Sequence, residues 1–335
     1  MAEKRPIKYY SHSQICSFRG CKRRWSYRYE DKLKSRAPQK PLYLGSTIHR
    51  LLEARLNSMK SDDPSTPNWH EVLLTEIKPK YDQMPQAYQE MLGEDFLEVC
   101  EKIMQEYDDI YYQDQGLMKV LGVELPIECK IPGTRDKFVG IVDAIVEING
   151  KQYVVEHKTF KTTKMSLEST WLNQQTSLYI RRLNQMGYHI DGVIWDMIKT
   201  ELPEPPRVLK DGSFGKQYSK QTIHSFIWAG VAPEQIPAST YEDIKDNYKN
   251  YFDRYITPVE PIAIEEVWND FVETVKEIRK NKSHARTLGK ECEWCEYKEL
   301  CKVSLTGGDV EYTKQLLFTT DKEKEETSDV SSNNN

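Results

Sequence analysis

Asp143, Glu156 and Lys158 combine two carboxylates with one amine, and their spacing indicates that they meet in space. They lie on the two sides of Asn149-Gly150, and Asn-Gly is the strongest short signal for a two-residue β-hairpin turn. Counting outward from that turn puts Asp143 directly opposite Glu156, where Cβ atoms are ~4.5–5.5 Å apart. Because side chains alternate along a strand, Lys158 shares the sheet face of Glu156.

Two carboxylates held this close on one face repel each other, and a divalent cation between them removes the repulsion. Mg²⁺ binds through one or two protein carboxylates, keeps waters and takes substrate phosphate as a further ligand. A nearby lysine can orient an attacking water or stabilise phosphate charge. The pattern is therefore suited to phosphodiester hydrolysis. The alternative is a solvated sheet face on which Asp143, Glu156 and Lys158 form a surface grouping.

The elements that must position this hairpin follow the order helix, three strands, helix and strand. The helices have apolar residues at helical spacing, the first strand alternates, and the two hairpin strands are more fully apolar and therefore more central. Residues 69–118 and 233–282 also have a helical pattern, whereas residues 201–222 are rich in Pro and Gly and predict a loop. The ordered elements span residues 46–57, 119–131, 137–148, 151–160, 168–187 and 192–200.

The seven cysteines indicate a second site. Cys292, Cys295 and Cys301 follow a C-x2-C-x5-C pattern, and the first pair has the spacing at which two thiolates reach one metal centre. Clustered cysteines in an intracellular chain indicate a metal site rather than disulfides. A fourth thiolate is needed, and Cys21 and Cys16 are the candidates. Zinc and an iron–sulfur cluster both accept four cysteines.

The formal net charge is −5, which weighs against a nucleic-acid protein that is basic throughout. Residues 19–36, however, are strongly basic and interleaved with aromatic side chains, and a binding groove needs local rather than global positive charge. A solvated basic helix is the alternative. The candidate DNA-binding residues in this segment are Lys22, Arg23, Arg24 and Trp25.

The chain has 335 residues, of which 38% are hydrophobic and 30% are charged, and this suits a folded core with much solvated helical surface. No apolar run approaches the ~18 residues that span a bilayer, and residues 1–14 lack the apolar core of a signal peptide. We therefore expect an intracellular, cytoplasmic protein without a membrane partner. Residues 317–335 are polar and low in complexity, which predicts a disordered tail.

Five short motifs, in order along the chain, resemble those of the PD-(D/E)XK nuclease superfamily. The likeness is to its RecB-like branch, which includes phage-encoded exonucleases, the AddB nuclease domain and the iron–sulfur nuclease of CRISPR adaptation. In the cysteine motif, Lys22 stands where the family has proline. The motifs are Cys21-Lys-Arg-Arg-Trp25, Gly45-Ser-Thr-Ile-His49, Gly140-Ile-Val-Asp143, Glu156-His-Lys158 and Gln175-Thr-Ser-Leu-Tyr179.

The resemblance implies a metal-dependent deoxyribonuclease whose site lies on the hairpin. Lys158 is implied to act on the water or the phosphate, while Gln175 and Tyr179 help to position DNA and that lysine. The implied activity is that of an exonuclease that processes DNA ends in recombination, replication or repair, phage-like, with a recombination or replication protein as partner. The implied ligands of Mg²⁺ or Mn²⁺ are His49, Asp143, Glu156 and the backbone carbonyl of His157.

For the cysteines, the resemblance favours Cys21 over Cys16 and a structural [4Fe–4S] cluster over zinc, which would close the N- and C-terminal regions together. The implied fold is α/β, with a restriction-endonuclease-like αβββαβ core, a mixed central sheet and helical insertions. It predicts a single nuclease domain over residues 1–316, with a core (40–56 and 119–200), a helical insertion (57–118), a helical C-terminal part (201–290) and cluster-binding positions (21 and 291–302).

Two other functions fit parts of the sequence. A catalytically inactive DNA-binding module of the same fold would bind DNA without cleaving it, and the complete set of His49, Asp143, Glu156 and Lys158 argues against it. A zinc-stabilised interaction protein would bind neither DNA nor a divalent cation at the hairpin.

Overall fold

The computed structural model describes residues 6–215 and 218–320, and the contacts within the chain divide it into two compact units. Strands β3 (Lys119–Lys130) and β4 (Lys137–Ile148) each have residues in both units. The single nuclease domain over residues 1–316 stays a prediction. Among the described residues, unit 1 comprises residues 6–38, 128–140 and 262–320, and unit 2 comprises residues 39–127, 141–215 and 218–261.

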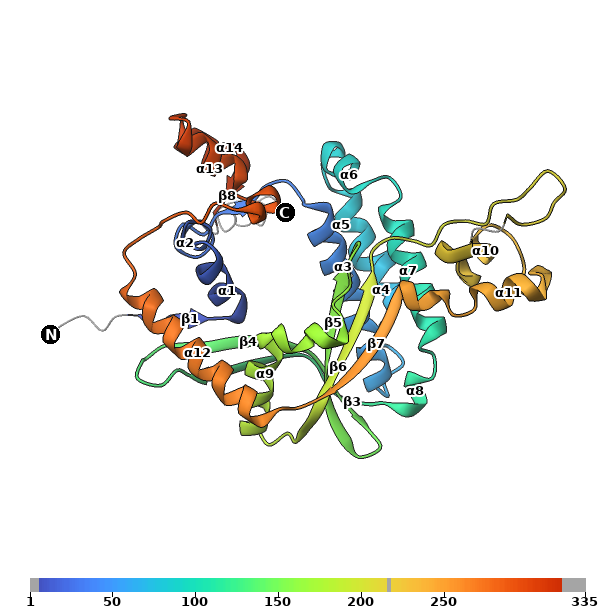
Figure 1. Cartoon of the computed structure of the whole chain (residues 1–335), viewed down its shortest axis with the longest axis horizontal. Helices are drawn as coiled ribbons and strands as arrows, with labels where there is room; N and C mark the ends of the chain where they lie inside the picture. Colours follow the sequence, from blue (N-terminus) through green and yellow to red (C-terminus); the bar gives the residue numbers. More distant parts are fainter. Residues whose placement is uncertain (1–5, 216–217, 321–335) are drawn as a thin grey trace. The chain divides into compact units, whose positions relative to one another are not determined.

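The central sheet is mixed, as predicted, with the strands in the order β1, β4, β5, β6 and β7, and with β3 also paired to β4 (Figure 1). Neighbours β1 and β4 are parallel, β4 and β5 antiparallel, β5 and β6 parallel, and β6 and β7 antiparallel. The parallel strands β5 and β6 are connected through helix α9, as a parallel crossover requires. The remaining strands of the sheet are β1 (Tyr9–Tyr10), β5 (Lys151–Phe160), β6 (Ile190–Lys199) and β7 (Phe252–Pro258).

Strand β7 corrects the prediction that residues 233–282 are helical throughout. Its residues pair with β6 from Gly192–Pro258 to Ile198–Phe252. Its Arg254 contacts buried Asp196 of β6, whereas Ile256, two residues further along, is 58% exposed. A strand with a half-buried charged residue and an exposed apolar residue lacks the alternation from which a strand is recognised.

The β4–β5 hairpin follows the predicted register. Asn149 and Gly150 have φ angles of 51° and 76°, as an Asn-Gly turn requires, and pairing runs from Ile148–Lys151 to Ala144–Val155. Regular pairing stops there. The next residue, Asp143, instead accepts the backbone N–H of His157 with its side-chain Oδ2 at 2.9 Å. The two strands therefore open into a fork at Asp143.

Helix α3 (Lys40–Lys60) belongs to unit 2, as does Asp143 at the fork. Its apolar stripe packs in one core cluster with α7 (Phe96–Ile110). A Cβ atom at Gly45 would lie 2.9 Å from Oγ1 of Thr159, so the glycine permits α3 to lie close to β5. The other helices of unit 2 are α4 (Trp69–Val72), α5 (Lys78–Asp82), α6 (Gln86–Leu92), α8 (Asp114–Leu117), α9 (Gln174–Gln185), α10 (Ile223–Trp228) and α11 (Ala238–Ile244), with π turn η2 (Leu73–Ile77) and 3-10 turns η3 (Leu167–Leu172), η4 (Tyr218–Lys220), η5 (Pro233–Gln235) and η6 (Asn247–Asn250).

Unit 1 is built around α12 (Pro261–Lys280), whose Trp268 and Phe271 pack edge-on against Phe138 of β4. None of the helices in the described ranges combines the length and apolarity needed to cross a membrane. The other elements of unit 1 are α1 (His12–Gly20), α2 (Lys22–Trp25), β2 (Lys34–Ser35), α13 (Lys298–Leu305), α14 (Val310–Leu317) and β8 (Phe318–Thr319), with π turn η1 (Ser26–Glu30) and 3-10 turn η7 (Lys290–Trp294).

The start of the predicted disordered tail is ordered. Phe318 and Thr319 pair with β2, and the Phe318 ring stacks on Tyr297 with centroids 5.3 Å apart. This apolar anchor explains the order, because Phe318 is only 3% exposed. The remainder of the predicted tail, residues 321–335, lies outside the described residues.

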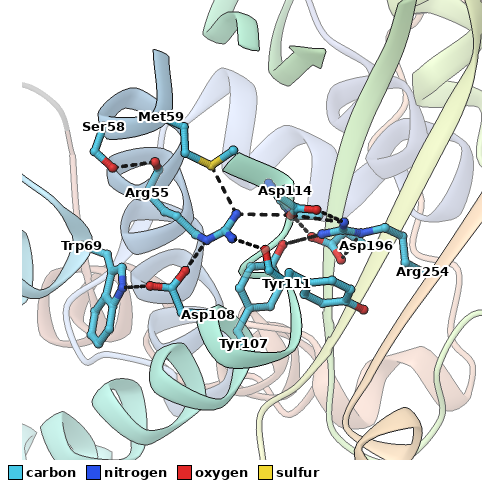
Figure 2. Close-up of polar contacts among 11 residues, drawn as sticks. Arg55, Ser58, Met59, Trp69, Tyr107, Asp108, Tyr111, Asp114, Asp196 and Arg254 are labelled. Carbon is cyan, nitrogen blue, oxygen red and sulfur yellow. Dashed lines mark hydrogen bonds and ion pairs between the residues drawn. The ribbon is translucent and has the colours of Figure 1, made fainter. Parts of the chain in front are cut away.

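A buried polar network around Asp196 connects β5, β6, β7 and α7. Asp196 of β6 is fully buried and accepts hydrogen bonds from Arg254 of β7 and Tyr107 of α7 (Figure 2). Burial alone would raise the pKa of Asp196, but Arg254 and His157 hold it well below its usual range. The same Arg254 donates to Asp114 at 3.0 Å, so one guanidinium serves two carboxylates.

Replacement of Arg254 by methionine is expected to destabilise the protein by about 3–5 kcal/mol, because it leaves Asp196 and Asp114 without their shared counter-charge. Urea unfolding followed by circular dichroism measures the loss. The matched control is Lys249→Met, which removes an exposed ion pair with Asp246 and should cost at most about 1 kcal/mol. Equal effects of the two substitutions would contradict a structural role for the buried pair.

Candidate active site

Four predicted site residues from three elements converge at the fork between β4 and β5. His49 of α3 has its Nδ1 3.7 Å from Oδ2 of Asp143 on β4. On β5, the Nζ of Lys158 lies 2.5 Å from Oε1 of Glu156. All four belong to unit 2. The structure thus brings together residues that are up to 109 positions apart in sequence, since 158 − 49 = 109.

Glu156 is the least accessible member of this group, with 1% of its surface exposed. Its Oε1 faces Lys158, but its Oε2 is buried without a hydrogen-bond partner in the described part of the chain. Burial raises the pKa of Glu156 to about 7, with a further upward contribution from Asp143 and an opposing one from Lys158. A buried carboxylate oxygen without a partner is costly, and a cation would satisfy it.

The pKa of His49 favours the protonation state that a metal ligand needs. Burial lowers its pKa to about 4, although the neighbouring Asp143 carboxylate opposes the shift. At neutral pH the imidazole is therefore uncharged and keeps a lone pair, which is the form that binds a metal ion.

Helix α9 adds the predicted Gln175 and Tyr179 to the site. Asn173 caps the helix by accepting the backbone N–H of Gln175 at 3.0 Å, and Nε2 of Gln175 donates to the Tyr179 hydroxyl at 3.0 Å. Burial, together with the charges of Glu156 and Asp143, raises the pKa of Tyr179 to about 12. The hydroxyl thus stays protonated beside the two carboxylates and can donate a hydrogen bond there.

Two acidic residues near the fork were not predicted. Burial raises the pKa of Glu124 to about 7, and the nearby charges of Asp143 and Glu53 add to the shift. Glu124 lies within β3 with a φ of 44°, and the alternation of buried positions changes phase across it, from Val120 and Gly122 to Ile127. Glu53 lies four residues after His49, so the helical spacing was a usable signal for it.

The donors at the fork suit a hard divalent cation. Carboxylate oxygens of Asp143 and Glu156 are ligands that Mg²⁺ and Mn²⁺ prefer, and neutral His49 adds a nitrogen. As the side chains stand, no three or more His, Cys, Asp and Glu residues within residues 6–215 and 218–320 form a group that could hold a metal ion.

Four cysteines of unit 1 line one cavity of about 490 Å³: Cys21, Cys292, Cys295 and Cys301. All are free thiols, and the competing Cys16 is not part of the lining. Burial raises the pKa of the Cys295 thiol, while the Arg24 guanidinium opposes this. The cavity also carries the basic side chains Arg24, Arg286, Lys298 and Lys302, which offset the charge that several thiolates would bring.

The basic segment differs from the prediction at its aromatic residue. Trp25 is 4% exposed and packs edge-on against Phe18 with ring centroids 5.4 Å apart, so its face is not free to stack on a base. The burial of the large apolar surface of the Trp25 ring in unit 1 stabilises the fold, and this explains why the ring is not exposed. The DNA contacts expected of Lys22, Arg23 and Arg24 stay predictions, and Arg24 also lines the cysteine cavity.

Comparison with known families gives one match over most of the chain. The model of the PD-(D/E)XK nuclease superfamily matches residues 9–302, which include every predicted ligand and catalytic residue. No curated protein sequence shows a significant match.

Among solved structures, similarities are distant. A protein of Eubacterium rectale with a provisional assignment as an exonuclease is 13% identical, with a TM-score of 0.47, over 85% of this chain and 87% of that chain. The structure of SSO0001 is 13% identical, with a TM-score of 0.36, over 90% of this chain and 88% of that chain.

In metal-free buffer, Glu156→Gln is expected to stabilise the protein increasingly as the pH rises from about 4.5 to about 7. The pKa of Glu156 is raised to about 7 in the folded state, so the folded protein binds more protons than the unfolded chain in this window and loses stability as pH increases. Glutamine lacks that titration. Thermal unfolding at several pH values measures the difference, with Glu147→Gln on the neighbouring strand as the control. A gap in Tm that stays constant with pH would contradict the shifted pKa.

Proposed function

Because the chain belongs to the PD-(D/E)XK nuclease superfamily, we propose that it is a deoxyribonuclease that hydrolyses phosphodiester bonds with Mg²⁺ or Mn²⁺. The observation that carries this proposal is the buried Glu156 carboxylate at the fork, with one oxygen paired to Lys158 and the other without a partner among the described residues. A structural sheet gains nothing from such a group, whereas a cation site requires it.

The proposed ligands are His49, Asp143, Glu156 and the backbone carbonyl of His157. A bound cation would lower the pKa of a coordinated water and offset charge on the scissile phosphate. The Lys158 ammonium orients that water or stabilises the charge that develops on the phosphate. Tyr179 stays protonated at neutral pH because its pKa is about 12, so its hydroxyl is available as a hydrogen-bond donor in the same site.

We further propose that the substrate is DNA with free ends, and that the enzyme is an exonuclease of recombination, replication or repair. The motif order supports this, since it resembles the RecB-like branch and its phage-encoded exonucleases. The basic residues Lys22, Arg23 and Arg24 are proposed to contact the DNA backbone, because phosphate contacts need positive charge but no base reading. A recombination or replication protein is the proposed partner.

Glu156→Ala and Lys158→Ala are each expected to lower cleavage of end-labelled DNA by about 10²–10³-fold in Mg²⁺ or Mn²⁺, because each removes a group that stabilises the transition state. Gel assays on single- and double-stranded substrates measure the effect.

Glu147→Ala on β4 and Lys151→Ala on β5 are the matched controls for this assay, since they remove the same kinds of charge from the same hairpin away from the fork. They should keep wild-type activity. A folded wild type that binds DNA but leaves it intact would favour the inactive DNA-binding module instead.

For unit 1 we propose a structural [4Fe–4S] cluster held by Cys21, Cys292, Cys295 and Cys301. The shared cavity supports it, and so does the basic lining, because a cluster ligated by four thiolates is anionic. The cluster would fasten the N-terminal segment to the C-terminal one. The contact between Arg28 and Glu296 at 2.6 Å already links these segments.

Cys295→Ala is expected to abolish the brown colour and bound iron of anaerobic preparations and to lower thermal stability, because metal-binding energy is folding energy in such sites. Visible absorption and metal analysis measure the loss. Cys16→Ser, which changes an exposed thiol outside the cavity, should leave colour and iron content unchanged. A colourless wild type with one zinc ion per chain would overturn the iron assignment.

A further inference from the structure

Trp171 is the most exposed of the seven tryptophans, with 78% of its surface accessible to solvent. It lies in the 3-10 turn η3, on the segment that connects β5 to α9. Both elements carry residues of the proposed active site, namely Glu156 and Lys158 on β5 and Gln175 on α9. Since Trp171 is four positions before Gln175, the chain between them spans at most roughly 14 Å. The exposed ring is therefore tethered close to the active site.

The turn that carries Trp171 is ordered by its own hydrogen bonds. Oγ1 of Thr170, which is 7% exposed, donates to the carbonyl of Leu167 at 2.7 Å. The N–H of Asn173, the residue that caps α9, donates to the carbonyl of Thr170 at 3.0 Å. The backbone on both sides of the ring is thus held in place. The outward position of Trp171 is a defined feature of the turn, and a ring held in this way loses little freedom when it binds a ligand.

Positive charge accompanies this segment. Nζ of Lys161, which is 67% exposed, lies 3.7 Å from Oε1 of Glu201, and the other oxygen of Glu201 lies 3.6 Å from Nζ of Lys199. Two ammonium groups therefore share one carboxylate. Exposed ion pairs of this kind are weak, so Lys161 can exchange its partner for a phosphate. Within residues 161–173 the lysines outnumber the single acid, Glu168, which suits the backbone of a nucleic-acid strand.

We propose that Trp171 is a binding residue for single-stranded DNA, whose indole ring stacks on an unpaired base beside the scissile phosphate. The proposal rests on the proposed function, because it concerns the substrate of that same site. Stacking on an aromatic ring tolerates every base, since each base has a π-face. In a duplex these faces are covered by the neighbouring base pairs. The preferred substrate is therefore a single strand or the unpaired end of a duplex.

The test measures binding of a fluorescein-labelled oligothymidylate to the full-length protein by fluorescence anisotropy, with Ca²⁺ in place of Mg²⁺ and with the DNA checked for cleavage on a gel. Trp171→Ala should weaken binding on the order of tenfold, because stacking on a base is lost. Trp171→Phe keeps an aromatic face and should recover most of the affinity. Tyr112→Ala is the matched control, since it removes an aromatic side chain of the same unit that is 64% exposed, and it should leave the affinity unchanged.

A second ligand separates stacking from a structural role of the ring. An oligomer of abasic deoxyribose phosphates of the same length keeps the phosphate charges but has no bases, so wild type and Trp171→Ala should bind it equally. Equal losses on both ligands would mean that the ring only holds the turn. Unchanged affinity of Trp171→Ala for oligothymidylate would leave the ring to a protein partner. Either result overturns the stacking proposal, and cleavage of DNA by the wild type would still leave the nuclease standing. A folded wild type that neither binds nor cleaves DNA would reject both.

Discussion

The burial of the Glu156 carboxylate is the constraint on which the active-site region depends. An acid that is 1% exposed next to Asp143 resists ionisation, and Lys158 only partly offsets that cost. The surrounding elements hold the carboxylate in position despite this. Strand β6 pairs with β5 along its length, and Gly45 lets α3 come close enough for His49 to face Asp143. These contacts fix the backbone on which the site residues stand, although the side chains form no metal-holding group in the described part of the chain as they stand.

The second buried carboxylate, Asp196, explains how β5 is kept rigid. It contacts His157 of β5, Arg254 of β7 and Tyr107 of α7 from its own position on β6. Replacing such a network by apolar residues often leaves stability unchanged, whereas removal of one partner is costly. Its retention is therefore better explained by geometry than by stability. Through its contact with His157, Asp196 holds β5 in place at the residue next to Glu156.

The sequence predicted what local signals encode. The Asn-Gly turn predicts the hairpin register correctly from Ile148–Lys151 to Ala144–Val155, and regular pairing ends one step before the predicted pair of Asp143 and Glu156. The features that the sequence did not predict have a common cause: each is determined by tertiary contacts. The contact of Arg254 is with a carboxylate 58 positions away in sequence, and the positive φ of Glu124 has no turn signature. Trp25 packs against Phe18, which lies outside the basic segment. Periodicity contains no information about such partners.

The two candidate metal sites differ in donor type, and the donor type determines which metal each site would prefer. Thiolates in unit 1 select iron–sulfur clusters or zinc, whereas carboxylates in unit 2 select Mg²⁺ and Mn²⁺. Each imidazole added to the carboxylate site reduces this contrast, because imidazole also suits zinc. With His49 as a single imidazole among carboxylates, the contrast between the two donor sets stays large.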